Sequence, residues 1–310
     1  MITSIPFGIP EKYASGLIDG SIVRIGTLLK DSTSGHILAH VQETGLAHNL
    51  LDGVLSSPFS PISALSSVGA NIQISQLAKL VSGLKTLQYA SLGASVAGIG
   101  VSAVGFVLMN KKLNKIQEQM SSFSQRVEQQ FQELKERDFR ARYSLIQGLY
   151  ERADHAFHLR FPASEWQCIA SDLSNESAFF RGELLYLLKQ KEFDSMLFNS
   201  LITSYGICNA GRTECLLLAG EMQAAVKTAE TVAQHYTMFD SMNTVDLEQK
   251  SGQTQSKMKE LVNGVRDAQD AAFTKPYLLN TLVEQGIDGR AYITALREEK
   301  EHPLLMLQTT

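Results

Sequence analysis

The sequence predicts a mainly α protein that begins with a small β-hairpin module, continues as a long apolar-to-amphipathic helix and ends in a helical bundle. Two short β-prone runs precede residue 60, and residues 62–161 contain no proline. Residues 162–310 alternate helical apolar spacings with turn signals. We therefore expect three domains: an N-terminal module (1–60), the apolar segment with the long helix (61–161) and the C-terminal bundle (162–310).

The N-terminal module contains two runs that favour strands. Residues 22–29 and 36–44 are rich in β-branched and apolar side chains, and residues 31–35 between them are typical of turns. This order predicts a β-hairpin. Because an isolated hairpin is marginally stable in water, we expect it to pack on another part of the chain.

The most unusual segment is an uncharged run of 23 residues, 87–109, followed closely by Lys111, Lys112 and Lys115. Charged residues make up 19% of the chain, yet only Lys79 and Lys85 are charged between residues 53 and 110. A helix of this length matches the roughly 30 Å hydrocarbon core of a bilayer. Either lipid or other protein must cover such a helix, so a fully buried core helix is the alternative interpretation.

Small residues recur along one face of this run. A stripe of this kind lets two helices approach closely, which is how helices associate in lipid. The positions that we expect at the contact are Ala90, Gly93, Ala94, Ala97, Gly98, Gly100, Ser102 and Gly105. The large apolar side chains favour insertion by about 3–5 kcal/mol in total, and the glycines and serines reduce that gain. Such marginal insertion suits a helix that enters with partners or is sheltered until a trigger acts.

After the run, apolar residues alternate at spacings of mostly three and four, with charged and amide side chains on the other face. The pattern predicts a coiled-coil seam formed by Leu113, Ile116, Met120, Phe123, Val127, Phe131 and Leu134. The seam can serve an intermolecular coiled coil or pack within the protein's own bundle. We expect one very long helix that ends at Pro162.

Turn signals divide the C-terminal part into shorter predicted helices. They lie at residues 209–211, 251–252, 275–276 and 286–289, and they combine glycine, proline, asparagine and serine. Between them, segments 176–191, 213–235 and 254–273 have apolar residues at helical spacing. We expect a helical bundle.

Motifs that carry chemistry are weak in this chain. Residues 206–213 have the spacing of a phosphate-binding loop, but Arg212 stands where lysine belongs and no βαβ unit surrounds it. We expect a helix–turn–helix corner there, with Gly211 in the turn. Glu151, His155 and His158 are close in sequence, but three such residues without a further ligand motif indicate a solvated helix face.

The composition of the chain limits which kinds of binding partner and cellular compartment we expect. A net charge of −4 and mixed signs along the predicted helix argue against a nucleic-acid partner. The three cysteines, Cys168, Cys208 and Cys215, are too few for a disulfide framework. The first residues lack a basic region followed by an apolar stretch, so we expect a membrane to be reached from the cytoplasm. No catalytic motif, cofactor or metal site is expected.

These observations lead to one main hypothesis and two alternatives. The chain is expected to be a non-enzymatic membrane-active protein that binds the lipid bilayer and forms a homo-oligomer through the small-residue stripe. Its plan resembles that of α-helical pore-forming proteins, which include bacterial toxins and effectors. The first alternative is a soluble, cytoplasmic scaffold whose apolar helix is buried in a bundle or an oligomer interface. The second is a nucleotide-binding switch that depends on Arg212.

Overall fold

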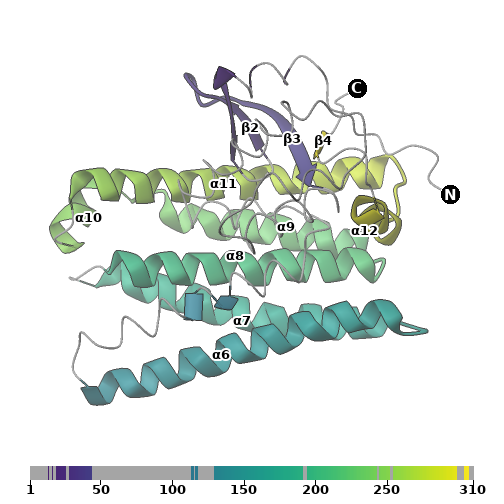
Figure 1. Cartoon of the computed structure of the whole chain (residues 1–310), viewed down its shortest axis with the longest axis horizontal. Coiled ribbons are helices and arrows are strands. Elements are labelled where there is room, and N and C mark those ends of the chain that lie inside the picture. Colours follow the sequence, from purple (N-terminus) through teal and green to yellow (C-terminus); the bar gives the residue numbers. More distant parts are fainter. Residues whose placement is uncertain are drawn as a thin grey trace, which may run out of the picture.

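The structure is a computed structural model, and it describes a defined part of the chain. The described residues are 13, 16, 19–25, 28–43, 113–114, 116–117, 129–190, 194–242, 244–251, 254–298 and 304–306. They form long helices stacked side by side and a small antiparallel sheet that lies beside α11, as Figure 1 shows. The predicted mainly α fold with an N-terminal sheet and a helical bundle is confirmed.

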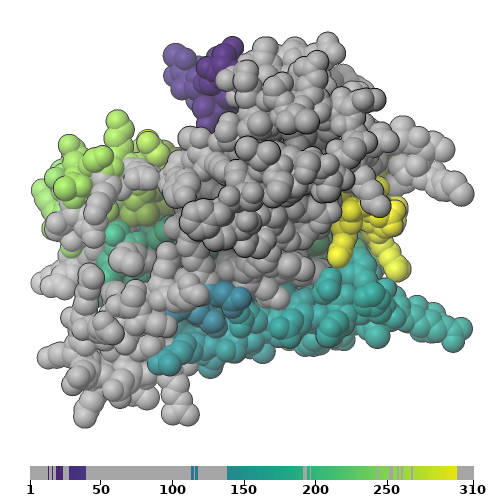
Figure 2. Space-filling view, viewed as in Figure 1, coloured from purple at the N-terminus to yellow at the C-terminus, as the bar shows by residue number. Residues whose placement is uncertain are grey.

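The bundle is built from helices, and the long helices run roughly parallel or antiparallel to one another (Figure 1). Their bounds are α6 Gln129–His155, α7 Ala163–Lys189, α8 Ser195–Leu218, α9 Met222–Tyr236, α10 Thr244–Ser251, α11 Gln255–Glu284 and α12 Gly289–Glu298, with short 3-10 turns η1 Ala156–His158 and η2 Thr237–Phe239. In the space-filling view, α10 and the start of α11 lie at one end of the molecule and α12 lies at the other (Figure 2).

Helix α8 occupies the centre of the bundle. It packs along α7 and also contacts α6, α9 and α12. Every residue from 200 to 211 is buried, whichever face of the helix it occupies. The sequence allows this enclosure because apolar and small side chains surround the helix instead of forming one stripe.

The predicted hairpin is present, with one more strand than expected. Strands β1 (Ile22–Ile25), β2 (Leu28–Asp31) and β3 (Ile37–Glu43) pair antiparallel in that order. The turn between β2 and β3 is held by the Asp31 carboxylate, which accepts hydrogen bonds from the backbone N–H groups of Thr33 (3.0 Å) and Ser34 (2.7 Å). The predicted first run, 22–29, therefore contains β1 and the start of β2.

The sheet is also joined and anchored by distant parts of the chain. Strand β4 (Leu304–Met306), which the sequence did not predict, pairs with β3. Leu28 and Leu29 are fully buried, and the ammonium of Lys30 lies 2.5 Å from the Asp270 carboxylate on α11. The hairpin thus packs on another part of the chain, as expected.

The structure differs from one uninterrupted helix that ends at Pro162. Helix α6 ends at His155. Residues 113–114 and 116–117 are also helical, and they lie beside α6: the side-chain amide of Gln147 on α6 donates a hydrogen bond to the side-chain oxygen of Asn114. These residues are 33 positions apart. In a continuous helix they would be separated by about 50 Å. The physical reason is burial: Leu113 and Ile116 join the core of the bundle instead of extending away from it.

Two predicted turns are wrong, and two are confirmed. Residues 209–211 lie inside α8, and Pro276 lies inside α11. Helix α10 ends at Ser251, the first residue of one predicted turn, and residues 286–289 connect α11 to α12 with Gly286 at φ +66°. The segment 213–235 contains an unpredicted break between α8 and α9, where Gly220 has φ +83°.

Gly211 is required by close packing and not by a turn. A Cβ atom at this position would lie 2.5 Å from the hydroxyl oxygen of Tyr150 on α6. Tyr150 is fully buried and donates a hydrogen bond to the carbonyl of Ile207 (2.7 Å), so its ring has little room to move. Glycine therefore lets α6 and α8 approach each other.

Replacing Gly211 by alanine should destabilise the protein by about 1–3 kcal/mol, because the added methyl group overpacks the contact with Tyr150. The matched control is Gly182→Ala on α7, where a Cβ would meet nothing within 4 Å. That change should stabilise the protein by about 0.5–1 kcal/mol through helix propensity. Urea unfolding followed by circular dichroism measures both effects. Equal stabilisation by the two variants would contradict the packing argument.

Candidate functional site

The predicted membrane-contact residues lie outside the described part of the chain. This holds for Ala90, Gly93, Ala94, Ala97, Gly98, Gly100, Ser102 and Gly105, and for the seam residues Met120, Phe123 and Val127. Phe131 and Leu134 lie within α6, but their side chains are outside the description. Among the helices that the structure describes, none combines the length and the apolar character needed to cross a bilayer.

The remaining two seam residues form an anchor next to the uncharged run. Leu113 is 0% exposed and Ile116 is 5% exposed, and both belong to the buried cluster that contains Phe139 and Ile146 of α6. Leu113 follows the last residue of the run, Met109, by only four positions. The bundle therefore holds the chain at a fixed place immediately after the uncharged run. We call Leu113, Asn114 and Ile116 the anchor.

The polar side chains of α8 are mostly satisfied inside the bundle. Ser204 hydrogen-bonds the hydroxyl of Tyr143 on α6 (3.0 Å), and Ser177 of α7 donates to the side-chain oxygen of Asn209 (2.9 Å). Thr213 donates to the Asn209 carbonyl (2.9 Å). Buried polar groups that are paired in this way fix the positions of neighbouring helices. The bonds of Ser204 and Asn209 with Tyr143 and Ser177 hold α8 against α6 and α7.

Glu214 of α8 is the exception to this pattern. It is 1% exposed, and neither of its carboxylate oxygens has a hydrogen-bond partner among the described residues. Burial raises the pKa of Glu214 to about 8, although Arg297 of α12 and Lys275 of α11 oppose the shift. Burial also lowers the pKa of Lys275 to about 8. The carboxyl group is therefore protonated and uncharged at neutral pH.

Nearby thiols are not activated nucleophiles. Cys208 and Cys215 are fully buried on α8, and burial raises the pKa of each thiol well above its ordinary value. A reactive cysteine needs the opposite shift, toward the thiolate. Both residues act as small apolar core side chains.

The structure does not support a phosphate-binding or metal-binding role for the weak sequence motifs. Residues 206–213 lie inside α8, where the backbone N–H groups belong to the helix and do not cradle a phosphate. Within the described residues, no group of three or more His, Cys, Asp or Glu side chains is arranged to hold a metal ion. Glu151, His155 and His158 are accordingly not such a group.

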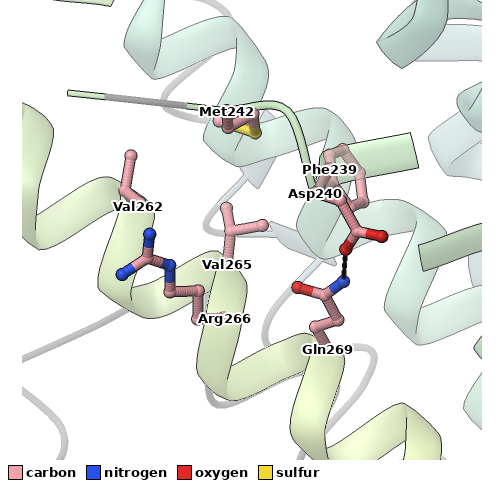
Figure 3. A pocket seen from close by; sticks show the side chains of 7 residues that line it. All are labelled: Phe239, Asp240, Met242, Val262, Val265, Arg266 and Gln269. Carbon is pink, nitrogen blue, oxygen red and sulfur yellow. Dashed lines mark hydrogen bonds between the residues drawn. The ribbon is translucent and has the colours of Figure 1, made fainter. Parts of the chain in front are cut away.

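Sequence reasoning missed a small pocket between η2 and α11, with a volume of about 310 Å³. Its apolar wall is formed by Phe239, Met242, Val262 and Val265, and its polar groups are Asp240, Arg266 and Gln269. In Figure 3, the side-chain amide of Gln269 donates a hydrogen bond to Asp240 across the pocket. No sequence motif marked this place, because its residues come from two elements brought together by folding.

Comparison with known proteins does not extend this picture. No protein-family model, no curated protein and no solved structure matches the chain.

The anchor should be important for stability within a single chain. Leu113→Ala removes a fully buried side chain and should destabilise the protein by about 2–5 kcal/mol. The control is Leu145→Ala on α6, where the leucine is 49% exposed and the cost should be about 0.5 kcal/mol. Urea unfolding at several protein concentrations measures both variants. A Leu113 effect that disappears on dilution would indicate an intermolecular seam instead.

Glu214 should make stability depend on pH. Its pKa is raised from 4.5 to about 8 in the folded protein, so its contribution is fully present below pH 4.5 and is lost as the pH rises through 8. Within that window the free energy of unfolding should fall by up to about 1.4 kcal/mol per pH unit. Glu214→Gln should remove this part of the slope, and the exposed change Glu284→Gln should keep it. Urea titrations across the window test the prediction, and an unchanged slope in Glu214→Gln would refute it.

Proposed function

We propose that this chain is a non-enzymatic, membrane-active helical protein whose uncharged run, residues 87–109, inserts into a lipid bilayer. The observation that carries the proposal is the run itself: 23 residues without a charge, followed by Lys111, Lys112 and Lys115. Its length suits the hydrocarbon core, and the lysines suit the headgroup region at its end. The membrane is reached from the cytoplasm.

In this proposal the chain forms a homo-oligomer through the small-residue stripe of the run. Ala90, Ala94, Gly98 and Ser102 stack four positions apart on a helix, so two copies can approach closely. The marginal insertion energy of one run makes such association important, because helix contacts add to the stability of the inserted state. A pore-forming effector or toxin is the class of protein that this combination suits best.

The helical bundle serves as the soluble body to which the run is attached. Leu113 and Ile116 are buried beside α6, so the chain is fixed to the bundle four residues after the run. This anchor favours a run that is inserted next to the bundle over one held at the tip of a long stalk.

A second candidate is a soluble scaffold whose apolar helix is covered by its own bundle or by an oligomer interface. The burial of Leu113 and Ile116 within the same chain favours it, since neighbouring apolar residues can follow them into protein contacts. The two candidates differ in one property. The membrane-active protein stays in the pellet after alkaline carbonate extraction, whereas the scaffold is monodisperse without detergent.

The proposal predicts that the purified protein releases dye from liposomes and that Gly98→Leu abolishes most of the release. The larger side chain prevents close helix contact while keeping the run apolar. The matched control is Val107→Leu, which adds bulk away from the stripe and should release dye as the wild type does. Circular dichroism confirms that each variant is folded. Equal leakage from Gly98→Leu would show that the stripe is irrelevant, and no leakage from the wild type would oppose membrane permeabilisation.

A further inference from the structure

Two arginines meet where α7, α8 and α9 pack together. The Arg181 guanidinium of α7 hydrogen-bonds Nε2 of His235 on α9, and Nδ1 of the same ring lies 3.1 Å from the hydroxyl of Tyr205 on α8. Arg212 lies two helical turns beyond Tyr205 on the same face of α8. The positive charges of both guanidiniums favour a lower pKa for His235 and for Tyr205, so we group the four side chains together. We call this group the arginine cluster.

The hydrogen bonds of the His235 ring determine which of its two nitrogens carries the proton. A guanidinium only donates, so Nε2 of His235 accepts the bond from Arg181 and the ring proton is on Nδ1. Nδ1–H then donates to the Tyr205 hydroxyl. Burial and the two arginines lower the pKa of His235, which keeps the ring neutral at pH 7. The ring orients Arg181 without neutralising it, and the cluster carries two positive charges.

Three other arginines of the bundle have acidic partners. Arg142 pairs with Glu176 at 2.9 Å, Arg152 with Glu165 at 2.9 Å, and Arg297 with Asp154 at 3.4 Å. Among the described residues, no carboxylate pairs with Arg181 or Arg212, and Arg212 has no hydrogen-bond acceptor at all. The cluster therefore differs from an ordinary structural ion pair.

A bound anion would make this arrangement more favourable. Arg212 is partly buried, and the loss of hydration lowers its pKa. A guanidinium that loses water without gaining an acceptor costs free energy, and a second guanidinium nearby adds repulsion. A bound anion would supply acceptors to both side chains and would cancel their charge.

We infer that Arg181 and Arg212 bind the phosphate group of a phosphate monoester, with His235 and Tyr205 as positioning residues. The two positive charges match the charge of about −1.5 to −2 that a phosphate monoester carries at pH 7. Guanidiniums bind phosphate oxygens in a two-pronged geometry, and a tetrahedral phosphate offers enough oxygens for two of them. A carboxylate has one charge and two oxygens, so it would satisfy one arginine only.

The same group occurs in soluble esters and in the headgroup of phosphatidic acid. The inference does not depend on the membrane-active role, because the arginine cluster lies on the bundle and not on residues 87–109. It also differs from the hypothesis of a phosphate-binding loop at residues 206–213, because side chains from separate helices, and not loop N–H groups, make the site.

The test measures binding of two probes to the full chain at constant ionic strength. Glycerol 3-phosphate is titrated by calorimetry, and vesicles with or without phosphatidic acid are used in flotation. Arg181→Gln and Arg212→Gln should each weaken binding by about tenfold or more, since each removes charge-assisted hydrogen bonds. Binding of glycerol 3-phosphate identifies a soluble source, and binding of phosphatidic acid vesicles alone identifies a lipid source.

Controls separate the site from general charge effects. Arg160→Gln removes the same charge from an exposed arginine between α6 and α7 and should bind as the wild type does. Arg212→Lys keeps the charge without the forked geometry and should bind more weakly than the wild type but more tightly than Arg212→Gln. Thermal unfolding verifies that each variant is folded. Failure of the wild type to bind either probe, or binding that both glutamine variants retain, would overturn the inference, and neither result bears on dye release.

Discussion

Enclosing α8 inside the bundle is the constraint on which the other contacts depend. A helix with neighbours on every side cannot direct its polar residues into water, so each of them needs a partner inside the protein. Ser204 and Asn209 find such partners on α6 and α7. The same enclosure brings α6 close enough to require glycine at position 211. The packing of the central helix thus decides both the hydrogen bonds and the close approaches of its neighbours.

The enclosure of α8 also explains why two of its ionisable side chains, Glu214 and Arg212, differ in charge state at neutral pH. Glu214 points into the interior without a close partner and remains protonated at neutral pH, whereas Arg212 lies at a partly open position and keeps its charge. These residues are two positions apart on a helix and therefore face different neighbours. One helix consequently presents a neutral acid to the core and a cation to the junction with α7 and α9.

Turn residues in the sequence correctly predicted two of the turns in the structure. The turn after β2 was predictable because Asp31 and Gly35 have turn chemistry that does not depend on the rest of the fold. The glycine at 286 also marked a real break between helices. Gly211 and Pro276 were misleading, because a tight helix contact explains the glycine and a long helix accommodates the proline. The roles of Gly211 and Pro276 depend on tertiary packing, which cannot be inferred from the residues next to them in the sequence.

Features made by distant residues could not be predicted in the same way. Burial of Leu113 followed from the apolar spacing, but its position beside α6 required knowledge of the chain's path. The arginine cluster joins residues from three helices, and the sequence drew attention to Arg212 alone, as part of a loop motif that does not form. The uncharged run remains the clearest functional signal, and it is a property of composition, not of tertiary contacts.

The pairing of β4 with β3 has a consequence for how the protein is made. Residues 41–43 pair with residues 304–306, so this edge of the sheet can close only after residues 304–306 have been synthesised. Contacts between residues so far apart form slowly, because a very long loop must close first. The helices of the bundle, with their short connections, can assemble during synthesis. Until residues 304–306 pair with it, this edge of β3 has unpaired backbone groups, and such an edge can pair with other chains.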